Sequence, residues 1–568
     1  METRQRSYFH GVGGPALLGL CVGEVLHQTA AAYPDQPALV VRHQNRRYTY
    51  REFCGEVALT ARSLLHLGVQ KGDRVGVWAT NCAEWVITQF ATAQIGAILV
   101  NINPAYRAYE LEYALRQSEC QTLLLMQGFR DCDYVSTLAG ICPELETSRA
   151  GDLSSQKLPH LKNLIFFGDG APRGMFRWND LAEFGQRVAE QDLRARGAAL
   201  DFDDPINIQY TSGTTGFPKG ALLSHHNIVN NGLLIGGSMK ITARDKICIP
   251  VPFYHCFGMV LGNMTAVVAG AAMVIPAPYF DALGTLAAVE EERCTALYGV
   301  PTMFIAELEH PQFNRFDLRS LRTGIMAGSP CPIEVMRRVV EQMHCGQMTI
   351  AYGLTETSPV VTQTTTEDPI ELRVTTVGKP LPHTEIKIAD TQTGRPVPIG
   401  VTGELCARGY MVMKGYYKNP DATHCILDPD GWLHSGDLAV MDENGYCRVT
   451  GRVKDMIIRG GENIYPREIE EFLYTCPVIS DVQVIGVPDR KYGEEVVAWV
   501  KLKEGKELSE QEIKDFCQGK ISNFKIPRYI RFVDSFPMTV TGKIQKFKMR
   551  EISTRELGLE SAAKPNLT

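Results

Sequence analysis

The chain has 568 residues, which is more than one domain usually holds. Apolar residues make up 44% and charged residues 21%, as in an ordinary globular protein, and a formal net charge of −6 gives no strong attraction to nucleic acid or to an anionic membrane. Sixteen cysteines are scattered without a Cys-x-x-Cys pair or a Cys/His cluster at zinc spacing, so we expect reduced core cysteines of a cytosol-like compartment.

The N-terminal region fits two interpretations. Arg4 and Arg6 precede an apolar run at 15–22, which loosely resembles a targeting segment. The stretch 19–32 also has the spacing of an ordinary amphipathic helix. The sequence favours the helix and the cytoplasm, and it leaves a targeting segment and the mitochondrial matrix as the alternative.

Strand-like and helix-like segments alternate through the first three quarters of the chain. This alternation predicts an α/β architecture whose sheet is buried and largely parallel. The uncharged stretch 257–280 is interrupted by Asn263, Thr265 and Pro276, which favours a buried helix and a core strand over a membrane span. The strand-like runs are 74–78, 97–100, 122–126, 163–167, 206–210, 272–275, 296–300 and 348–351, and the helix-like stretches include 83–93, 283–292 and 333–343.

The last quarter has a different pattern. Asp-Gly and Asn-Gly pairs within 400–450 predict β-hairpins. After residue 453, helix-like stretches alternate with strand-like runs over about 100 residues, enough for a separate small domain. The helix-like stretches are 466–475 and 509–517, and the strand-like runs are 482–487, 496–500 and 529–533. We therefore expect one domain over 1–453 and a second over 454–568.

The stretch 210–220 is the first candidate ligand site. It combines glycines with serine and threonine hydroxyls and ends at Lys219-Gly220, between a strand-like run and a helical pattern. Glycines allow backbone N–H groups to point inward around a phosphate, and Lys219 adds positive charge. A flexible surface loop fits the composition as well. The Gly-x-x-x-x-Gly-Lys-Ser/Thr pattern of a P-loop is absent.

Four later segments carry further ligand groups, and each alone also fits an ordinary turn or loop. In 352–357, Tyr352 can stack on a base, while a hydroxyl and a carboxylate can hold Mg²⁺ at the end of a strand. Asp437 can accept hydrogen bonds from two ribose hydroxyls. The stretch 451–466 crowds charges and glycines at the expected domain junction, and Lys543 follows a glycine in a loop.

In this order and spacing, the five segments resemble the adenylate-forming superfamily of acyl-CoA synthetases, luciferases and peptide-synthetase adenylation domains. The resemblance covers about residues 20–550, nearly the whole chain. The sequence is most similar to the medium-chain fatty acyl-CoA synthetase group, through the stretches 204–209, 224–231, 454–466 and 521–527. The resemblance implies a large multi-sheet N-terminal adenylating domain and a small, mobile α+β C-terminal lid domain.

The implied activity is the ATP-dependent ligation of a fatty acid to coenzyme A. An acyl-AMP intermediate forms first, pyrophosphate leaves, and the thiol of CoA then expels AMP. ATP, Mg²⁺ and CoA are the implied cofactor and co-substrates. The expected partners are small molecules, without nucleic acid and without a transmembrane segment, and a homodimer is left open.

The resemblance also implies residue roles. Lys543 would bridge the substrate carboxylate and the α-phosphate, with Thr355 near that phosphate, and Glu356 would bind Mg²⁺. His255 would position the carboxylate and close the acyl tunnel. The implied ATP-binding residues are Thr211, Ser212, Gly213, Thr214, Thr215, Gly216, Phe217, Pro218, Lys219, Ala327, Gly328, Ser329, Tyr352, Gly353, Asp437 and Arg452.

The remaining implied roles concern the second half-reaction and the acyl site. Lys454 would be the hinge between the domains, and Gly460 and Gly461 would approach the pantetheine chain of CoA. The implied acyl-pocket residues are Met259, Tyr298, Gly299, Val300 and Met326. Gly299 would leave room for the chain.

Three alternatives stay open. The first is a CoA ligase for an aryl or branched carboxylic acid. The second is an adenylating enzyme that passes the acyl group to another acceptor, such as a carrier protein or oxygen. The third is a nucleotide-binding relative without activity, which the presence of Lys543, Glu356 and Asp437 disfavours.

Overall fold

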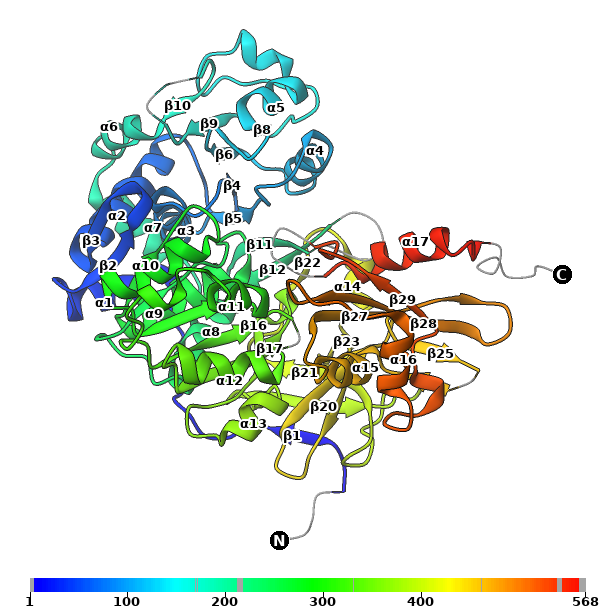
Figure 1. The fold of residues 1–568 in the computed structure, drawn as a ribbon. Helices are drawn as coiled ribbons and strands as arrows, with labels where there is room; N and C mark the ends of the chain where they lie inside the picture. The colour runs from blue at the N-terminus through cyan, green and yellow to red at the C-terminus, as the bar shows by residue number, and fades with distance from the viewer. Residues whose placement is uncertain are drawn as a thin grey trace. The chain divides into compact units, whose positions relative to one another are not determined.

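The computed structural model describes residues 5–168, 170, 172–211, 218–329, 331–460, 462–538 and 544–560 (Figure 1). The chain forms two compact units. The large unit holds residues 10–385 and 407–433, and the small unit holds residues 1–9, 386–406 and 434–568. The expected domain boundary at 453/454 lies within the small unit and stays a prediction.

The first sheet of the large unit has parallel strands at its centre. The pairs β4–β5, β4–β6, β6–β9 and β5–β11 are parallel, whereas β11–β12 and β12–β22 are antiparallel. The order is β10 (Phe176–Arg177), β9 (Asn163–Phe166), β6 (Thr122–Leu125), β4 (Arg74–Trp78), β5 (Ile98–Asn101), β11 (Pro205–Thr211), β12 (Lys219–Ser224) and β22 (Gly415–Tyr416). The glycine-rich stretch therefore joins two neighbouring strands of this sheet.

The second sheet of the large unit is also parallel at its centre, from β2 through β14, β13, β15 and β16 to β17. Antiparallel strands close both edges. The order is β19 (Lys379–Pro380), β18 (Val360–Gln363), β17 (Gln347–Gly353), β16 (Thr323–Ala327), β15 (Ala296–Gly299), β13 (Lys246–Cys248), β14 (Ala272–Ile275), β2 (Pro37–Val41) and β3 (Arg46–Thr49). The two parallel sheets confirm the predicted α/β architecture.

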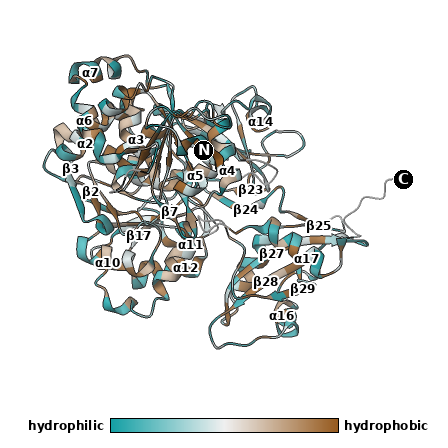
Figure 2. Cartoon of the chain, turned by 90° about the horizontal axis from the view of Figure 1, so that it is seen from above, coloured by the Kyte–Doolittle hydropathy of each residue, from teal (hydrophilic) through white to brown (hydrophobic). Residues whose placement is uncertain are grey.

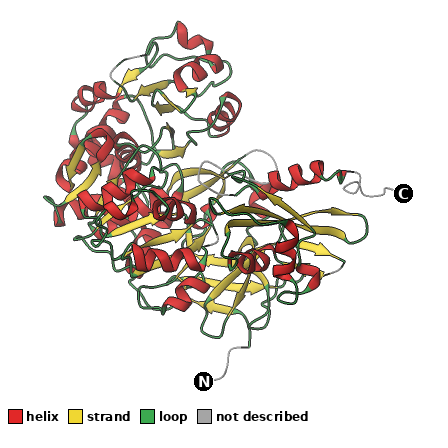
Figure 3. Cartoon of the chain, viewed as in Figure 1, coloured by secondary structure: helices red, strands yellow, loops and turns green. Residues whose placement is uncertain are grey.

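Helices surround these sheets (Figure 3). Local sequence fixes where several of them begin: Ser224 accepts a hydrogen bond from the Asn227 amide at the start of α8, and Asp281 accepts one from Gly284 at the start of α10. The helices of the large unit are α1 (Val22–Ala32), α2 (Tyr50–His66), α3 (Ala83–Ile95), α4 (Ala108–Gln117), α5 (Tyr134–Ile141), α6 (Leu181–Gln186), α7 (Glu190–Ala198), α8 (His225–Ser238), α9 (Thr265–Ala269), α10 (Ala282–Glu292), α11 (Pro301–Leu308), α12 (Ile333–Gln342), α13 (Ile370–Thr375) and α14 (Pro420–His424).

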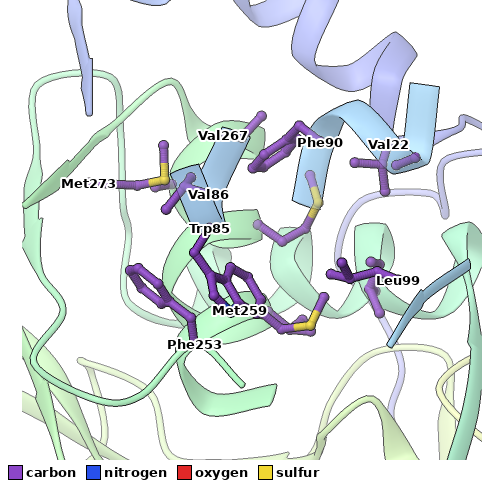
Figure 4. Close-up of a cluster of buried hydrophobic side chains, with 14 of the residues drawn as sticks. Val22, Trp85, Val86, Phe90, Leu99, Phe253, Met259, Val267 and Met273 are labelled. Carbon is purple, nitrogen blue, oxygen red and sulfur yellow. The ribbon is translucent and has the colours of Figure 1, made fainter. Parts of the chain in front are cut away.

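The main hydrophobic core of the large unit surrounds helix α3, which is buried along its whole length. Trp85 of α3 packs against Phe253 with ring centroids 5.4 Å apart, and Met259 and Phe90 lie in the same cluster (Figure 4). The strands of the large unit are predominantly hydrophobic, whereas its helices also carry hydrophilic residues (Figure 2). Met259 belongs to a π-helix at Phe257–Met264, which continues into α9. The predicted buried helix and core strand at 257–280 are thus confirmed.

Two further sheets complete the fold. One has the order β1 (Tyr8–His10), β20 (Thr384–Ala389), β21 (Gly403–Gly409), β23 (Leu433–Met441) and β24 (Cys447–Arg452). The other lies in the small unit and has the order β26 (Glu462–Ile464), β25 (Ile457–Arg459), β28 (Gly493–Leu502) and β27 (Ile479–Asp489), with β29 (Tyr529–Phe532) paired to β28. Helices α15 (Pro466–Tyr474), α16 (Glu510–Cys517) and α17 (Lys546–Glu556) belong to the same unit.

The cysteines are unpaired and mostly inside. Cys425 is exposed, Cys54 is partly buried, and the other cysteines are buried. Within the described part of the chain, no helix combines the length and the apolar composition needed to cross a bilayer.

Candidate active site

The carboxyl ends of parallel strands β15, β16 and β17 form one edge of the second sheet. The register pairs Gly299 with Met326 and Ala327 with Ala351. Residues that follow these strands therefore leave the sheet at the same edge, which is where open α/β sheets bind ligands. The structure brings together there the predicted residues Val300, Ala327, Gly328, Ser329, Tyr352 and Gly353.

Two glycines are required at this edge for different reasons. A Cβ atom on Gly353 would lie 1.8 Å from the carbonyl oxygen of Pro359, so that only glycine fits between β17 and the chain that returns from the turn. Gly328 has a φ of +88°, in the left-handed region that disfavours other residues. Both glycines thus shape the backbone next to Tyr352.

Glu356 lies in a single 3₁₀ turn (Thr355–Thr357) directly after β17. Its side chain is nearly buried, and its Oε1 accepts a 2.6 Å hydrogen bond from the hydroxyl of Tyr416. The backbone amide of Met413 donates a 2.9 Å hydrogen bond to the Glu356 carbonyl. Burial and the adjacent Glu356 carboxylate raise the pKa of Tyr416, so the phenol stays protonated and remains a donor.

His255 and Thr355 come from distant segments that meet in the large unit. The Nδ1 atom of His255 accepts a 3.2 Å hydrogen bond from the Phe257 amide, which leaves the proton of the neutral ring on Nε2. The neighbouring Cys256 Sγ lies 3.8 Å from the hydroxyl of Thr355. His255, the predicted carboxylate-positioning residue, is therefore the sequence neighbour of a residue that contacts Thr355 in the predicted phosphate-side turn.

The predicted acyl-pocket residues fall on two faces of the second sheet. Met259, Tyr298 and Val300 belong to the main core, whereas Met326 belongs to the cluster on the opposite face. Gly299 also faces that opposite side, where a Cβ would lie 3.0 Å from the Phe304 ring. The space above Gly299 is therefore filled by Phe304, and the expectation that Gly299 leaves room for an acyl chain receives no support from the structure.

Amide side chains surround the sulfur of Met259. Asn101 Nδ2 and Gln209 Nε2 lie 3.2 and 3.1 Å from Met259 Sδ, and Gln89 donates to the Met259 carbonyl. The hydroxyl of Tyr298 is buried and has no hydrogen-bond partner among the described residues. The apolar core at Met259 and Tyr298 therefore contains a few buried polar atoms.

The hairpin β11–β12 carries the candidate phosphate loop. Thr211 pairs with Lys219 in the antiparallel register, and its hydroxyl lies 3.3 Å from the Lys219 carbonyl. The carbonyl of Pro218 accepts a hydrogen bond from Tyr113. The ammonium group of Lys219 lies 5.3 Å from the centroid of the Tyr416 ring. Six residues of the predicted loop, Ser212, Gly213, Thr214, Thr215, Gly216 and Phe217, lie outside the described residues.

In the small unit, Asp437 and Arg452 face each other across the hairpin β23–β24. They are register partners, and Arg452 Nε donates a 2.8 Å hydrogen bond to Asp437 Oδ1. Asp437 is buried and its amide donates to the Ser435 hydroxyl, whereas the Arg452 side chain is half-exposed. The two residues predicted to bind ribose are therefore brought together by strand pairing.

A partly buried ion pair supports the turn before Asp437. Glu404 accepts hydrogen bonds from His434 Nδ1 at 2.8 Å and from the Gly436 amide at 2.9 Å. Contacts with Cys406 and Glu404 raise the pKa of His434 to about 10, so the imidazole is charged at neutral pH. Glu404, Cys406 and His434 each place one potential metal-ligand atom within 4.8 Å of the others. Sequence spacing could not reveal this cluster, because strand pairing creates it.

The predicted hinge and CoA residues also belong to the small unit. Lys454 lies in the turn that follows β24, where the amides of Asp455 and Met456 both donate to the Arg452 carbonyl. Gly460 has a φ of +61°, and its amide donates a 2.7 Å hydrogen bond to the Tyr492 carbonyl. Gly461 and Lys543 lie outside the described residues.

Tyr416 is the main site residue that the sequence analysis missed. It is 60 residues from Glu356 in sequence, and the two meet only because β22 pairs with β12. The only local signal is the small, apolar segment around Gly415-Tyr416, which is short and resembles an ordinary turn.

The α/β fold of the large unit and the order of its motifs agree with the adenylate-forming class of enzyme. The model of the AMP-binding enzyme family matches residues 26–417, and the model of the AMP-binding enzyme C-terminal domain matches residues 468–543. The chain therefore belongs to the AMP-binding enzyme family.

Similar proteins and solved structures support this family assignment. "Putative acyl-CoA synthetase YngI" of Bacillus subtilis is 54% identical, covering 96% of this chain and 99% of its own length. "Medium-chain acyl-CoA ligase ACSF2, mitochondrial" of Bos taurus is 46% identical, covering 97% and 91%. The anthranilate CoA ligase AuaEII with anthranoyl-AMP has a TM-score of 0.84 at 25% identity, covering 96% and 99%. ATP-bound MatB from Rhodopseudomonas palustris has a TM-score of 0.79 at 27% identity, covering 95% and 100%.

These findings confirm three expectations from the sequence. The chain has the adenylate-forming fold, it combines a large N-terminal with a small C-terminal family domain, and it is an AMP-forming acid–CoA ligase. The individual residue roles and the precise domain boundary are not tested by likeness of this kind, and they remain predictions.

Proposed function

We propose that the protein ligates a medium-chain fatty acid to coenzyme A. The observation that carries the proposal is the position of Glu356, which lies directly after β17 and is held by Tyr416, whose ring also contacts Lys219. Support for the acid comes from relatives named medium-chain acyl-CoA ligase, at 43 to 46% identity. The same proposal assigns the first half-reaction to the residues at this edge.

In the first half-reaction, a carboxylate oxygen of the fatty acid attacks the α-phosphorus of ATP, and the bond to the pyrophosphate oxygen breaks. Two anions must approach each other, so the barrier is lowered by positioned positive charge. Thr211 and Lys219 hold the β- and γ-phosphates at the hairpin. Lys543 bridges the carboxylate and the α-phosphate, and Thr355 contacts the same phosphate.

The residues near Glu356 fit a magnesium ion. A carboxylate beside the hydroxyl of Thr355 offers the hard oxygen ligands that Mg²⁺ prefers, and no soft ligand is needed. When bound, Mg²⁺ neutralises phosphate charge. Tyr352 stacks on the adenine beside Ala327, Gly328 and Ser329, which present backbone groups at the same sheet edge.

In the second half-reaction, the thiol sulfur of CoA attacks the acyl carbonyl, and AMP leaves with the electrons of the broken acyl–oxygen bond. Asp437 and Arg452 bind the ribose of the nucleotide. Rotation at Lys454 withdraws Lys543 after adenylation and presents Gly460 and Gly461 to the pantetheine chain, whose close approach needs residues without side chains.

His255 positions the carboxylate without acting as a base. An ionised carboxylate has no proton to lose, and Nδ1 already accepts the Phe257 amide. The contact of Cys256 with Thr355 places the histidine loop beside the phosphate-side turn.

The substrate assignment is tested by pyrophosphate release over a series of straight-chain acids from acetate to palmitate, with and without CoA. We expect the highest kcat/KM at medium chain length, with a change of about four-fold per methylene, since each buried methylene contributes about 0.8 kcal/mol. An optimum at acetate or palmitate would contradict the assignment. Release of pyrophosphate without any CoA thioester would indicate another acceptor.

An aryl-acid CoA ligase is the second candidate. The observation in its favour is the TM-score of 0.84 to an anthranilate CoA ligase, although the identity is only 25%. Including benzoate and anthranilate in the same assay separates the two candidates. A higher kcat/KM for the aryl acids than for any straight-chain acid would establish the second.

The proposal extends to the compartment and the oligomeric state. We place the protein in the cytoplasm because its cysteines are unpaired. The mitochondrial matrix is the alternative, because the ACSF2 relatives are named mitochondrial. Cell fractionation with antibody detection decides between these compartments, and light scattering on the purified protein tests for a homodimer.

A further inference from the structure

Tyr416 is held rigidly in the large unit. Its backbone pairs with Ala221 of β12, and its amide donates a 2.9 Å hydrogen bond to the hydroxyl of Thr423. Thr423 in turn donates to the carbonyl of Asn419, at the start of α14. The side chain of Tyr416 is also buried, so the surrounding residues restrict its position.

The two ends of this side chain serve different partners. The hydroxyl donates to Glu356 Oε1 at 2.6 Å, a charge-assisted bond that is short and strong. The ring face lies 5.3 Å from the Lys219 ammonium, within the range of a cation–π contact. One side chain thus connects the turn after β17 with the hairpin β11–β12.

We propose that Tyr416 is a positioning residue for magnesium-bound ATP, a role that rests on the function proposed above. A carboxylate fixed at Oε1 presents Oε2 in a defined direction, so Glu356 needs little rearrangement to bind a cation. The ring restrains Lys219, which otherwise loses the rotamer freedom of a long side chain when it binds phosphate. Neither contribution requires Tyr416 to touch the reacting atoms.

The test compares Tyr416→Phe with Tyr417→Phe. The first variant keeps the ring and loses the hydroxyl that Glu356 accepts. The second removes a phenolic hydroxyl from the next residue in the chain, whose backbone carbonyl accepts from Gln117. ATP binding is measured by calorimetry without any carboxylic acid, so no turnover occurs, once with saturating magnesium and once with EDTA.

For Tyr416→Phe, we expect the Kd for ATP to rise about ten-fold with magnesium and to stay near the wild-type value in EDTA, as loss of one charge-assisted hydrogen bond would cause. Tyr417→Phe should match the wild type in both conditions. An unchanged Kd with magnesium in Tyr416→Phe would overturn the proposal. An equal rise in both conditions would also overturn it, since that result indicates a general packing defect.

The contribution of the ring is measured with Tyr416→Leu. This variant loses the contact with Lys219 as well, so its Kd for ATP should rise in EDTA by a few-fold, beyond that of Tyr416→Phe. If the Kd for ATP of Tyr416→Leu in EDTA equals that of Tyr416→Phe, the proposed role of the ring is wrong. If wild-type ATP binding itself does not depend on magnesium, both the magnesium role of Glu356 and the role of Tyr416 fail. If wild-type ATP binding depends on magnesium but the Kd of Tyr416→Phe is unchanged, only the proposed role of Tyr416 fails.

Discussion

At the scale of single residues, the site depends on glycines, which allow the backbone to approach closely, as well as on its polar side chains. Gly353 lets β17 and the returning chain approach so closely that a Cβ would lie 1.8 Å from the Pro359 oxygen. The placement of Tyr352, Thr355 and Glu356 therefore depends on a residue that contributes no chemistry.

Gly353→Ala is expected to weaken ATP binding at least ten-fold and to lower stability by about 1–3 kcal/mol, because the backbone must shift to relieve the overlap. Calorimetry with ATP and urea denaturation measure the two effects. Gly346→Ala is the matched control, because no atom lies within 4 Å of its added Cβ. Equal behaviour of the two variants would show that the close approach is unimportant.

Glu307 is a buried carboxyl group that the proposed mechanism does not use. Burial raises its pKa well above the usual 4.5, and its Oε2 has no hydrogen-bond partner among the described residues. Below pH 4.5 the group is protonated in both the folded and the unfolded chain. Above that pH only the unfolded chain ionises, so stability is lost as the pH rises toward the folded-state pKa.

Glu307→Gln removes this ionisation and should therefore stabilise the protein increasingly with pH. We expect a small difference near pH 5 and a larger gain near pH 7, growing by at most about 1.4 kcal/mol for each pH unit over which the folded group stays protonated. Urea denaturation at both pH values measures the difference. A difference that is the same at both would mean that Glu307 ionises in the folded state as readily as in the unfolded chain.

Residue types in a motif could be predicted from the sequence, but their contacts could not. Glu356 and Asp437 could be predicted as ligand groups because each lies in a recognisable short pattern. Tyr416 was missed because its partner is distant in sequence, and the sequence does not show which face of β15 Gly299 occupies. Both facts follow from strand register, which long-range pairing decides.

At the scale of elements, the hairpin β11–β12 and the turn after β24 have separate tasks in the proposed mechanism. The hairpin carries Lys219, which should act on pyrophosphate, a product of the first half-reaction only. The turn carries Lys454, which should act between the half-reactions.

Lys219→Ala should lower kcat/KM for ATP about 100-fold, the cost of one charge that stabilises developing phosphate charge. Transfer from preformed acyl-AMP to CoA should change less than three-fold, because no pyrophosphate takes part. Both rates are measured by quenched flow with a medium-chain acid. Equal loss in the two steps would contradict the assignment of Lys219 to the departing pyrophosphate.

Lys454→Pro should slow thioester formation more than ten-fold and leave adenylation near the wild-type rate, because proline restricts the rotation of the turn. The amides of Asp455 and Met456, which donate to the Arg452 carbonyl, are kept by the substitution. Single-turnover measurements separate the two steps. If both slow equally, the hinge at Lys454 loses its support.

Most elements could be predicted because their local signals agree with the fold. Buried parallel strands such as β4 and β6 are short apolar runs, and the start of α8 carries its own capping residues. The exceptions are very short strands such as β22, whose pairing is decided by the neighbouring β12 and not by propensity.

At the scale of the whole molecule, the sequence predicted the α/β class and the family correctly, because alternating periodicity and the order of motifs both extend along the chain. The division into units was harder to predict. Residues 386–406 group with 434–568, since β21 pairs with β23, and no composition change marks this return of the chain. Contiguous boundaries can be read from sequence, whereas a discontinuous unit requires the pairing.

The distribution of the cysteines allows one position of the protein to be labelled selectively. Among the sixteen thiols only Cys425 is exposed, and it directly follows α14, the helix whose Thr423 holds the backbone of Tyr416. Native protein treated with a limiting amount of a maleimide dye should incorporate about one dye per chain, since buried thiols react slowly. Peptide mapping should find the dye at Cys425, and Cys425→Ser should abolish rapid labelling. A fluorophore at Cys425 would then test whether adding ATP changes the surroundings of α14, without an engineered cysteine.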